Sequence, residues 1–238
     1  MLFEWNEQSI RWFLDAGAYT GYHKALAQII RRHLEPEDTL LDAGCGLGRL
    51  DLELAPYVKG ITAVDINECA LNALIVDIEN ADAGNINARC GDASVLNEDY
   101  DIILMSFFGE PDMPVFLEHC RRKIIRIVGA GTESGFYPQR YRRYKRPYAE
   151  DVRKELTALG VSFDMELCSI EFGQPLKSVK EAERYISFYT PEAEEQEIKD
   201  FLHQKLITTG RDDFPYYLPH NKELGIFVIK RSRFDEHI

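Results

Sequence analysis

The residues best suited to chemistry are an aspartate and three glycines that follow a short apolar run. Asp42 precedes Gly44, Gly46 and Gly48 in the stretch 39–50, TLLDAGCGLGRL. Glycine lets the backbone turn sharply and approach a ligand, and a helix that starts after such a turn directs N–H groups toward the ligand. The stretch therefore predicts a strand, a tight ligand-binding turn and a helix.

The spacing of these glycines separates the turn from two better-known glycine loops. A dinucleotide loop would need glycine at position 49, which is Arg49, and no G-K-[ST] follows as in a phosphate loop. The remaining pattern, D-x-G-x-G-x-G, resembles the first motif of the class I S-adenosylmethionine (SAM) dependent methyltransferases. The resemblance implies SAM as cofactor, S-adenosylhomocysteine as product, and cofactor contacts from Asp42, Gly44, Cys45, Gly46 and Gly48.

Three later runs of strand type also end in polar residues. Residues 61–64 end at Asp65, residues 88–90 at Gly-Asp, and residues 100–105 at a serine. A carboxylate after the second strand of a doubly wound fold can accept both ribose hydroxyls of a nucleoside, and the resemblance places the second acid near the adenine amine. It implies that these ends complete the cofactor site with Asp65, Ile66, Asp92, Ala93, Ser106 and Phe107.

Apolar runs alternate with segments of helical period along most of the chain. This alternation predicts a parallel sheet with right-handed crossovers, whose ligands lie at the carboxyl ends of the strands. The resemblance implies an α/β fold with a Rossmann-like, seven-stranded, mostly parallel sheet, helices on both faces, and strand seven antiparallel between strands five and six. We expect two helices within 8–33, interrupted around 15–18, and further helices at 67–80, 115–121, 150–159 and 192–207. Another helix should begin after Ser178, which forms a capping box with Glu181. The late strands are expected at 123–128, 161–172 and 224–230.

The chain is long enough for one large domain with a core. We therefore expect a single methyltransferase domain over residues 1–238, with an N-terminal helical lid at 1–38 and a substrate-side helical insertion at about 174–221. The cluster Tyr19-Thr20-Gly21-Tyr22-His23 lies in the expected lid. It has two interpretations, contact with the cofactor or substrate, and half-buried helix residues with solvated hydroxyls.

Composition excludes several classes of function. The 238 residues carry a net charge of −12, which opposes general affinity for nucleic acid or anionic membranes. Five scattered cysteines without C-x-x-C spacing indicate a reducing compartment and no zinc site, and no other metal-ligand spacing is visible. The first residues lack a secretory pattern and no window reaches bilayer length, so we expect a soluble, cytoplasmic protein.

Two segments bear on the methyl acceptor. Ser106-Phe107-Phe108-Gly109 lacks the proline pair of the [DNS]-P-P-[FYW] tetrad typical of methyltransferases that act on nucleobase amines. The segment from Arg140 to Arg146 interleaves five cations with tyrosines. Arginine and tyrosine suit anionic groups and flat rings, although a solvated basic loop would have the same composition.

We expect a SAM-dependent methyltransferase that acts on a small molecule of anionic or aromatic character, and neither the acceptor atom nor the oligomeric state can be read from the sequence. An amine nucleophile needs positioning and desolvation, whereas a hydroxyl would need a general base, for which location offers His23, Glu110 and Tyr137. Two alternatives remain: an RNA or tRNA methyltransferase that uses Arg140 to Arg146 as its phosphate-binding arm, and a non-catalytic SAM-binding protein.

Overall fold

The computed structural model describes residues 5–95, 97–109, 111–131, 136–137 and 147–230. The chain forms two compact units, each assembled from separate segments. Unit 1 comprises residues 1–22, 131–145 and 169–223, and unit 2 comprises residues 23–130, 146–168 and 224–238. The expected lid at 1–38 is thus divided, since its first helix belongs to unit 1 and its second to unit 2 from His23 onward.

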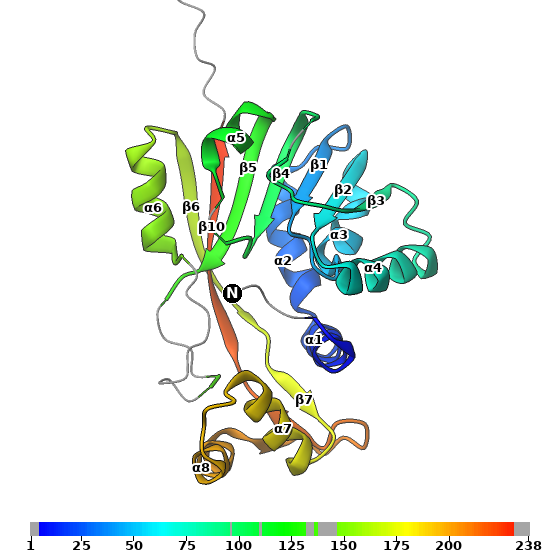
Figure 1. The fold of residues 1–238 in the computed structure, drawn as a ribbon, viewed down its shortest axis with the longest axis vertical. Coiled ribbons are helices and arrows are strands. Elements are labelled where there is room, and N and C mark those ends of the chain that lie inside the picture. The colour runs from blue at the N-terminus through cyan, green and yellow to red at the C-terminus, as the bar shows by residue number, and fades with distance from the viewer. Residues whose placement is uncertain (1–4, 96, 110, 132–135, 138–146, 231–238) are drawn as a thin grey trace, which may run out of the picture. The chain divides into compact units, whose positions relative to one another are not determined.

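A seven-stranded sheet forms the centre of unit 2 (Figure 1), in the order β3-β2-β1-β4-β5-β10-β6. The neighbours from β3 to β5 are parallel, and β10 runs antiparallel to β5, with Ile226 opposite Ile127. The sequence prediction of fold class is confirmed, including the antiparallel last strand between strands five and six. The strands are β1 Thr39–Ala43, β2 Gly60–Asp65, β3 Ile86–Cys90, β4 Tyr100–Ser106, β5 Cys120–Gly129, β6 Phe163–Glu171 and β10 Asn221–Lys230.

Helices flank this sheet because each presents an apolar stripe to it. Figure 1 shows α5 and α6 beside the half formed by β5, β10 and β6, and α2, α3 and α4 beside the half formed by β1 to β3. One core cluster joins Phe116 of α5 and Val152 of α6 to Ile103, Ile124 and Phe227 of the strands. The helices are α2 Tyr22–Ile30, α3 Arg49–Leu54, α4 Glu68–Asn80, α5 Met113–Glu118 and α6 Ala149–Ala158.

The N-terminal helical region breaks at a different place from the one predicted. Helix α1 spans Glu7–Thr20 without interruption, and the break comes at Gly21, whose φ of 68° is left-handed. Glycine adopts this conformation without a Cβ clash and so ends the helix, whereas Gly17 lies inside α1. The interruption expected around residues 15–18 was therefore wrong.

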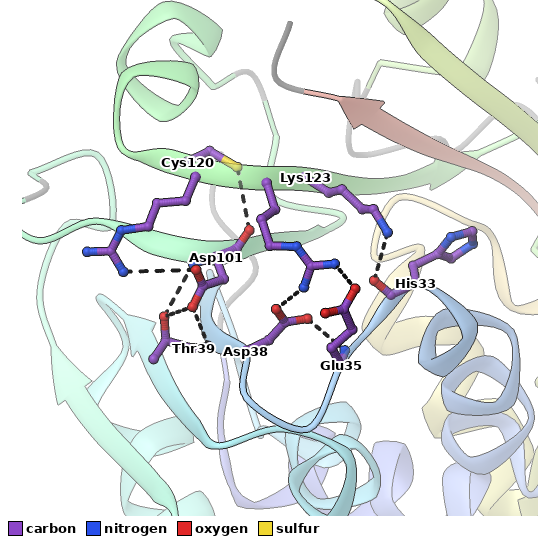
Figure 2. A network of polar contacts seen from close by, with 9 residues as sticks. His33, Glu35, Asp38, Thr39, Asp101, Cys120 and Lys123 are labelled. Atoms are coloured by element: carbon purple, nitrogen blue, oxygen red, sulfur yellow. Dashed lines mark hydrogen bonds and ion pairs between the residues drawn. The ribbon is translucent and has the colours of Figure 1, made fainter. Parts of the chain in front are cut away.

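A polar network holds the amino ends of β1, β4 and β5 together (Figure 2). Arg122 pairs with the buried Asp38 and with Glu35, and Asp101 accepts hydrogen bonds from the Thr39 amide at 2.9 Å and hydroxyl at 2.7 Å. Burial alone would raise the pKa of Asp101, but these hydrogen bonds and the nearby arginines lower it. The network lies at the edge of the sheet opposite the carboxyl ends of the strands and fixes where β1 begins.

Unit 1 is built around an aromatic core. Helices α1, α7 (Val179–Tyr189) and α8 (Glu195–Lys205) accompany a three-stranded sheet in the order β7-β9-β8, made of Gln174–Leu176, Tyr216–Leu218 and Ile207–Thr208. Its cluster includes Trp12, Phe136, Tyr185 and Leu202, and Trp12 meets Tyr185 edge to face at 5.1 Å between ring centroids. Residues 174–176, expected only to interrupt the large sheet, thus form a strand of a second sheet.

Ser178 caps α7 as predicted, since its hydroxyl accepts the Glu181 amide at 3.1 Å. The second half of the expected capping box is absent. The Glu181 carboxylate instead accepts the Lys177 amide at 2.7 Å and the Trp12 indole at 3.2 Å, and pairs with Arg11. These contacts tie α1 to the start of α7 within unit 1.

Boundaries of other elements also shift from their predicted positions, and β5 and β10 both begin three residues before the expected starts at 123 and 224. Helix α5 begins at Met113 and ends at Glu118, two or three residues before the expected limits, because β5 begins at Cys120. Helix α8 is shorter than the expected 192–207, and β6 ends before Phe172. No helix within the described ranges is long and apolar enough to span a membrane.

Candidate active site

The glycine turn lies at the carboxyl end of β1 in unit 2. Gly44, Gly46 and Gly48 have φ values of 74°, 54° and 58°, all left-handed. A Cβ built on Gly44 would meet the Phe108 ring at 2.6 Å, and one built on Gly48 would meet Leu74 at 2.3 Å. Glycine is therefore required both by conformation and by the closeness of the neighbouring side chains.

The N–H groups of the turn are used within the protein. Those of Gly44 and Cys45 donate to the Val64 carbonyl at 2.8 and 3.0 Å, and that of Gly46 donates to Asp65 Oδ2 at 2.8 Å. Helix α3, which follows, has six residues. The expectation that this helix would direct N–H groups at a ligand is therefore not supported, because α3 is too short to act as an N-terminal anion site.

Two fully buried carboxyl groups lie behind the turn. Asp42 of β1 is 2% exposed and Asp51 of α3 is 0% exposed, and both Asp51 oxygens and Oδ1 of Asp42 receive no hydrogen bond from a donor among the described residues. Burial raises the pKa of Asp42 to about 7, opposed by a hydrogen bond from protonated Asp51, and the negative charge of Asp65 adds to the rise. Burial and Asp42 raise the pKa of Asp51 well above its usual value, so the pair retains a proton in the fold.

Asp65 is the last residue of β2, and both of its carboxylate oxygens accept hydrogen bonds from backbone amides. One oxygen accepts the Gly46 amide and the other accepts the Asn67 amide at 2.9 Å, and Asn67 caps α4. Each carboxylate oxygen can accept more than one hydrogen bond, so Asp65 retains acceptor capacity for a ligand. Ile66, the next residue, is 52% exposed, so its apolar side chain is accessible to a ligand at this strand end.

The remaining predicted cofactor residues lie at two further strand ends. Asp92 is exposed after β3, where its carboxylate accepts the Ser94 amide at 2.8 Å, and Ala93 is buried behind it. Ser106 ends β4 and is followed by Phe107, a non-glycine residue with a φ of 57°. Because β1 pairs with β2 and β4, and β2 with β3, the strand ends of the prediction come to one edge of the sheet.

The site offers acceptors rather than cations. Asp42, Asp65 and Asp92 stand at or beside it, while Arg49, the cation next to the turn, pairs with Asp77 at 2.9 Å. Burial, together with the nearby carboxyls, also raises the pKa of the Cys45 thiol, which is therefore a neutral group. Such a surface suits a ligand that brings hydrogen-bond donors, such as an ammonium, hydroxyls and an amine, and disfavours phosphate.

A cavity of about 210 Å³ lies beside this edge, between Leu41, Thr62, Val64 and the connection from β3 to β4. Asp92 and Ala93 border it, and its lining comes in equal parts from strands of the sheet and from the connection between β3 and β4. Ligand pockets usually enclose about 300–1,000 Å³. The cavity is thus smaller than a ligand site and was not predicted.

The three candidate general bases are placed differently. His23 lies in α2 of unit 2, and Tyr137 lies in unit 1, where its hydroxyl bonds that of the buried Tyr185 at 3.2 Å. Glu110 and the basic segment Arg140 to Arg146 lie outside the described residues. None of these groups is assigned a role by the described geometry.

Sequence reasoning missed two residues of this region, Asp51 and Arg126, whereas for Phe108 it left open a wall of the site or core packing. Phe108 packs against Gly44 and, edge to face at 5.7 Å, against Phe116. Asp51 and Arg126 are charged residues inside apolar runs, Leu50-Asp51-Leu52 and Ile125-Arg126-Ile127. A charge within a run of buried type was the available signal, because such a group must find a partner in the interior.

The strand order, the antiparallel strand beside β5 and the acidic glycine turn at the carboxyl edge together define the class I SAM-dependent methyltransferase fold. Residues 40–124 match the model of a family described as methyltransferase domain. The resemblance inferred from the sequence is therefore confirmed.

Two proteins of similar sequence carry names that specify a methyltransferase reaction. The chain is 31% identical over 100 residues to a protein of Methanococcus maripaludis (strain C7) named "Probable cobalt-precorrin-6B C(15)-methyltransferase (decarboxylating)". The match covers 42% of this chain and 55% of that relative, so the chain spans about half its length. The counterpart in strain C6 is 26% identical over 149 residues, 61% of this chain and 75% of the relative.

Solved structures agree in fold. The precorrin 8W decarboxylase of Methanobacterium thermoautotrophicum superposes with a TM-score of 0.51 at 14% identity, covering 87% of this chain and 88% of that one. The magnesium protoporphyrin IX methyltransferase of Synechocystis PCC 6803, solved with bound SAM, gives 0.52 at 16% identity, covering 98% and 87%. These similarities extend over most of the chain, beyond the segment matched by the family model.

Proposed function

We propose that the protein is a SAM-dependent methyltransferase that acts on a small molecule, and that its cofactor binds at the carboxyl edge of unit 2. The observation that carries the proposal is the acceptor-only character of the edge around the glycine turn. SAM offers an α-ammonium, two ribose hydroxyls and an adenine amine, all of which are donors. The carboxylates of Asp65 and Asp92, at the ends of the neighbouring strands β2 and β3, match this set of donors better than they match a dinucleotide or a nucleoside phosphate.

In this proposal each residue at the carboxyl edge of the sheet contacts a different part of SAM. Asp65, held by the amides of Gly46 and Asn67, would accept the ribose hydroxyls, with Ile66 against the adenine ring and Asp92 on its amine. The Gly44–Gly48 turn would lie along the amino-acid part, where its carbonyl groups would accept hydrogen bonds from the ammonium, with Asp42 buried behind them. When bound, SAM supplies an electrophilic methyl group on its sulfonium, and the protein has to position a nucleophile in line with that group and exclude water.

The residues after β4 are expected to form the wall next to the transferred methyl group. Phe107 and Phe108 are half-buried, and Phe108 lies over Gly44. Their rings would exclude water from this part of the site while leaving acid–base work to a group that is not yet identified. Ser106 and Ala93 would contribute backbone surface at the neighbouring strand ends.

For the acceptor we propose a carboxylate-bearing tetrapyrrole. The two Methanococcus maripaludis relatives carry names that refer to cobalt-precorrin-6B, and a net charge of −12 opposes nucleic acid as substrate. The roles predicted for residues 1–38 as a lid and for 174–221 as a substrate-side insertion remain part of this proposal. So does the role of Arg140 to Arg146 in meeting the acidic groups of an acceptor.

The test is calorimetric titration of the purified protein with S-adenosylhomocysteine. Replacing Asp65 by Ala should weaken binding by about tenfold to a hundredfold, since hydrogen bonds to a charged group contribute about 1.5–3 kcal/mol. Replacing the exposed Asp92 by Ala, which leaves the turn undisturbed, should weaken it several-fold. Asp99→Ala, the same change at the opposite edge of the sheet, is the matched control and should bind normally.

Two outcomes would contradict the proposal. Absence of binding by the wild-type protein, or equal affinity of the Asp65 and Asp99 variants, would reject the cofactor assignment. Transfer of a labelled methyl group from SAM to RNA, rather than to a tetrapyrrole acid, at physiological salt would reject the proposed acceptor and favour the RNA alternative.

A further inference from the structure

Arg126 is a buried cation in the middle of a central strand of unit 2. It lies in β5 between Ile125 and Ile127, and its side chain is 3% exposed. Arginine is almost never fully buried unless it is paired, because the loss of hydration must be offset by close polar contacts. The partners of Arg126 therefore indicate what the residue does.

The guanidinium of Arg126 joins two segments that follow different strands. Its Nη1 pairs with Glu155 Oε2 of α6 at 2.8 Å, and its Nη2 donates to the Gly109 carbonyl at 3.3 Å. Glu155 is 35% exposed, so this pair extends from the interior to the surface. Gly109 belongs to the connection between β4 and α5, the segment that carries Phe107 and Phe108.

This connection has an unusual backbone and is held to β5 at two points. Phe107 and Gly109 both have left-handed φ values, 57° and 99°. The Phe107 amide donates to the Ile127 carbonyl at 2.9 Å, and two residues later the Gly109 carbonyl accepts from Arg126. A non-glycine residue keeps such a conformation when the surrounding structure holds it there.

Between these two points, Phe108 is directed onto the glycine turn. Its ring would be 2.6 Å from a Cβ on Gly44, so the two segments are in close contact. A shift of Gly109 would move Phe108 and alter the surface of the turn. The position of the turn thus depends on Arg126 through the backbone of the connection.

We propose that Arg126 is a positioning residue that holds the connection after β4, and with it Phe108, against the cofactor turn. The proposal rests on the function proposed above, because it concerns the wall of the same site. Arg126 acts through the Gly109 carbonyl, and Glu155 holds the guanidinium in the orientation that reaches it. The two acceptors are met by two different nitrogens of the planar fork, an arrangement that a single ammonium does not reproduce.

The experiment compares Arg126→Lys, Arg126→Met and Glu155→Gln by amide hydrogen exchange on the full chain. Lysine retains the buried charge and the pairing with Glu155, so we expect Arg126→Lys to keep its unfolding temperature close to wild type. Exchange in peptides covering residues 106–109 should nevertheless rise about tenfold, and affinity for S-adenosylhomocysteine should fall about tenfold. Arg126→Met should show the same local effect with a lower unfolding temperature. Glu155→Gln, the matched control, keeps an amide oxygen that can accept the hydrogen bond from Nη1 and so preserves the orientation of the guanidinium, and it should change exchange at 106–109 little.

Each alternative result is decisive. Unchanged exchange at residues 106–109 in Arg126→Lys, or an increase spread equally over β5 and α6, would overturn the positioning role. So would increased exchange at 106–109 with unchanged affinity for S-adenosylhomocysteine. If the wild-type protein does not bind S-adenosylhomocysteine, the proposed function fails, and the exchange comparison still decides whether Arg126 holds the connection.

Discussion

Replacing Asp51 by asparagine should remove a loss of stability that the wild-type protein undergoes as the pH rises. Asp42 and Asp51 are fully buried, three of their four oxygens receive no hydrogen bond from a donor among the described residues, and their pKa values are raised, that of Asp42 to about 7. The folded protein therefore holds a proton at pH 5–7 that the unfolded chain has released, because an ordinary aspartate ionises near 3.9. The stabilisation is complete below the unfolded pKa and declines as the pH rises toward the folded one.

One retained proton sets a lower limit for the size of the effect, because the pKa values of both carboxyls are raised. Each pH unit over which the folded state holds one extra proton costs about 1.4 kcal/mol of unfolding free energy. From pH 5 to pH 7 the pair should therefore cost the wild type at least about 3 kcal/mol. The other titratable groups next to the pair are Asp65 and Cys45; the Cys45 thiol is neutral, and the charge of Asp65 favours retention of the proton.

Asparagine at position 51 keeps a donor for the Asp42 carboxylate without needing a proton. The slope due to the pair should then disappear, so that Asp51→Asn gains about 3 kcal/mol relative to wild type between pH 5 and pH 7. The measurement is urea unfolding followed by circular dichroism at pH 5, 6 and 7. Asp82→Asn is the matched control, since Asp82 is exposed and its φ of 52° is tolerated by asparagine.

The comparison uses the difference between variants, so that other titrating groups cancel. Asp101, whose lowered pKa has the opposite effect at acid pH, is present in all three proteins. Parallel stability curves for wild type and Asp51→Asn would refute the shared proton. A control that loses the slope as well would show that the effect comes from net charge rather than from the buried pair.

Two further predictions concern the turn and the opposite edge of the sheet. Gly48→Ala should lower the free energy of unfolding by about 1–3 kcal/mol, because φ is 58° and the added Cβ would meet the Leu74 side chain at 2.3 Å. Gly84→Ala is the control and should cost little, since no atom lies within 4 Å of a Cβ built on Gly84. Equal melting temperatures of the two variants would contradict the prediction. Arg122→Met should cost about 3–5 kcal/mol because it leaves the buried Asp38 unpaired. Arg121→Met, which removes an exposed contact of 4.0 Å, should cost less than about 1 kcal/mol in the same urea assay.

The sheet was predictable because its signals are local. Each strand is a short apolar run, and each run that ends in a polar residue marks a carboxyl end, as at Asp65 and Ser106. The parallel crossovers and the family resemblance then determine the order. Strand β4 was predicted with the limits it has, Tyr100–Ser106.

Other features depend on contacts between residues far apart in the chain. The break at Gly21 rather than around Gly17 depends on which glycine adopts a left-handed conformation, and both have helical neighbours in sequence. The second sheet forms because residues 174–176 pair with residues 216–218. Local periodicity does not contain either of these facts.

The same distinction applies to the candidate site. Asp65 and the three glycines could be identified from spacing, because their conformational roles are set by adjacent residues. Asp51 and Arg126 could not, because a charge in an apolar run shows only that a partner exists. Their partners, Asp42 and the pair Glu155 and Gly109, are supplied by tertiary packing.

The position of β10 has a consequence for how the chain folds during synthesis. In the described sheet β6 is the last strand of the order and has β10 as its neighbour, and β10 also pairs with β5. Residues 221–230 are made after all the other strands, so β6 has no place in the sheet until they leave the ribosome. Its backbone groups must wait for that final segment, and a chain shortened before residue 221 would lose the attachment of two strands rather than one.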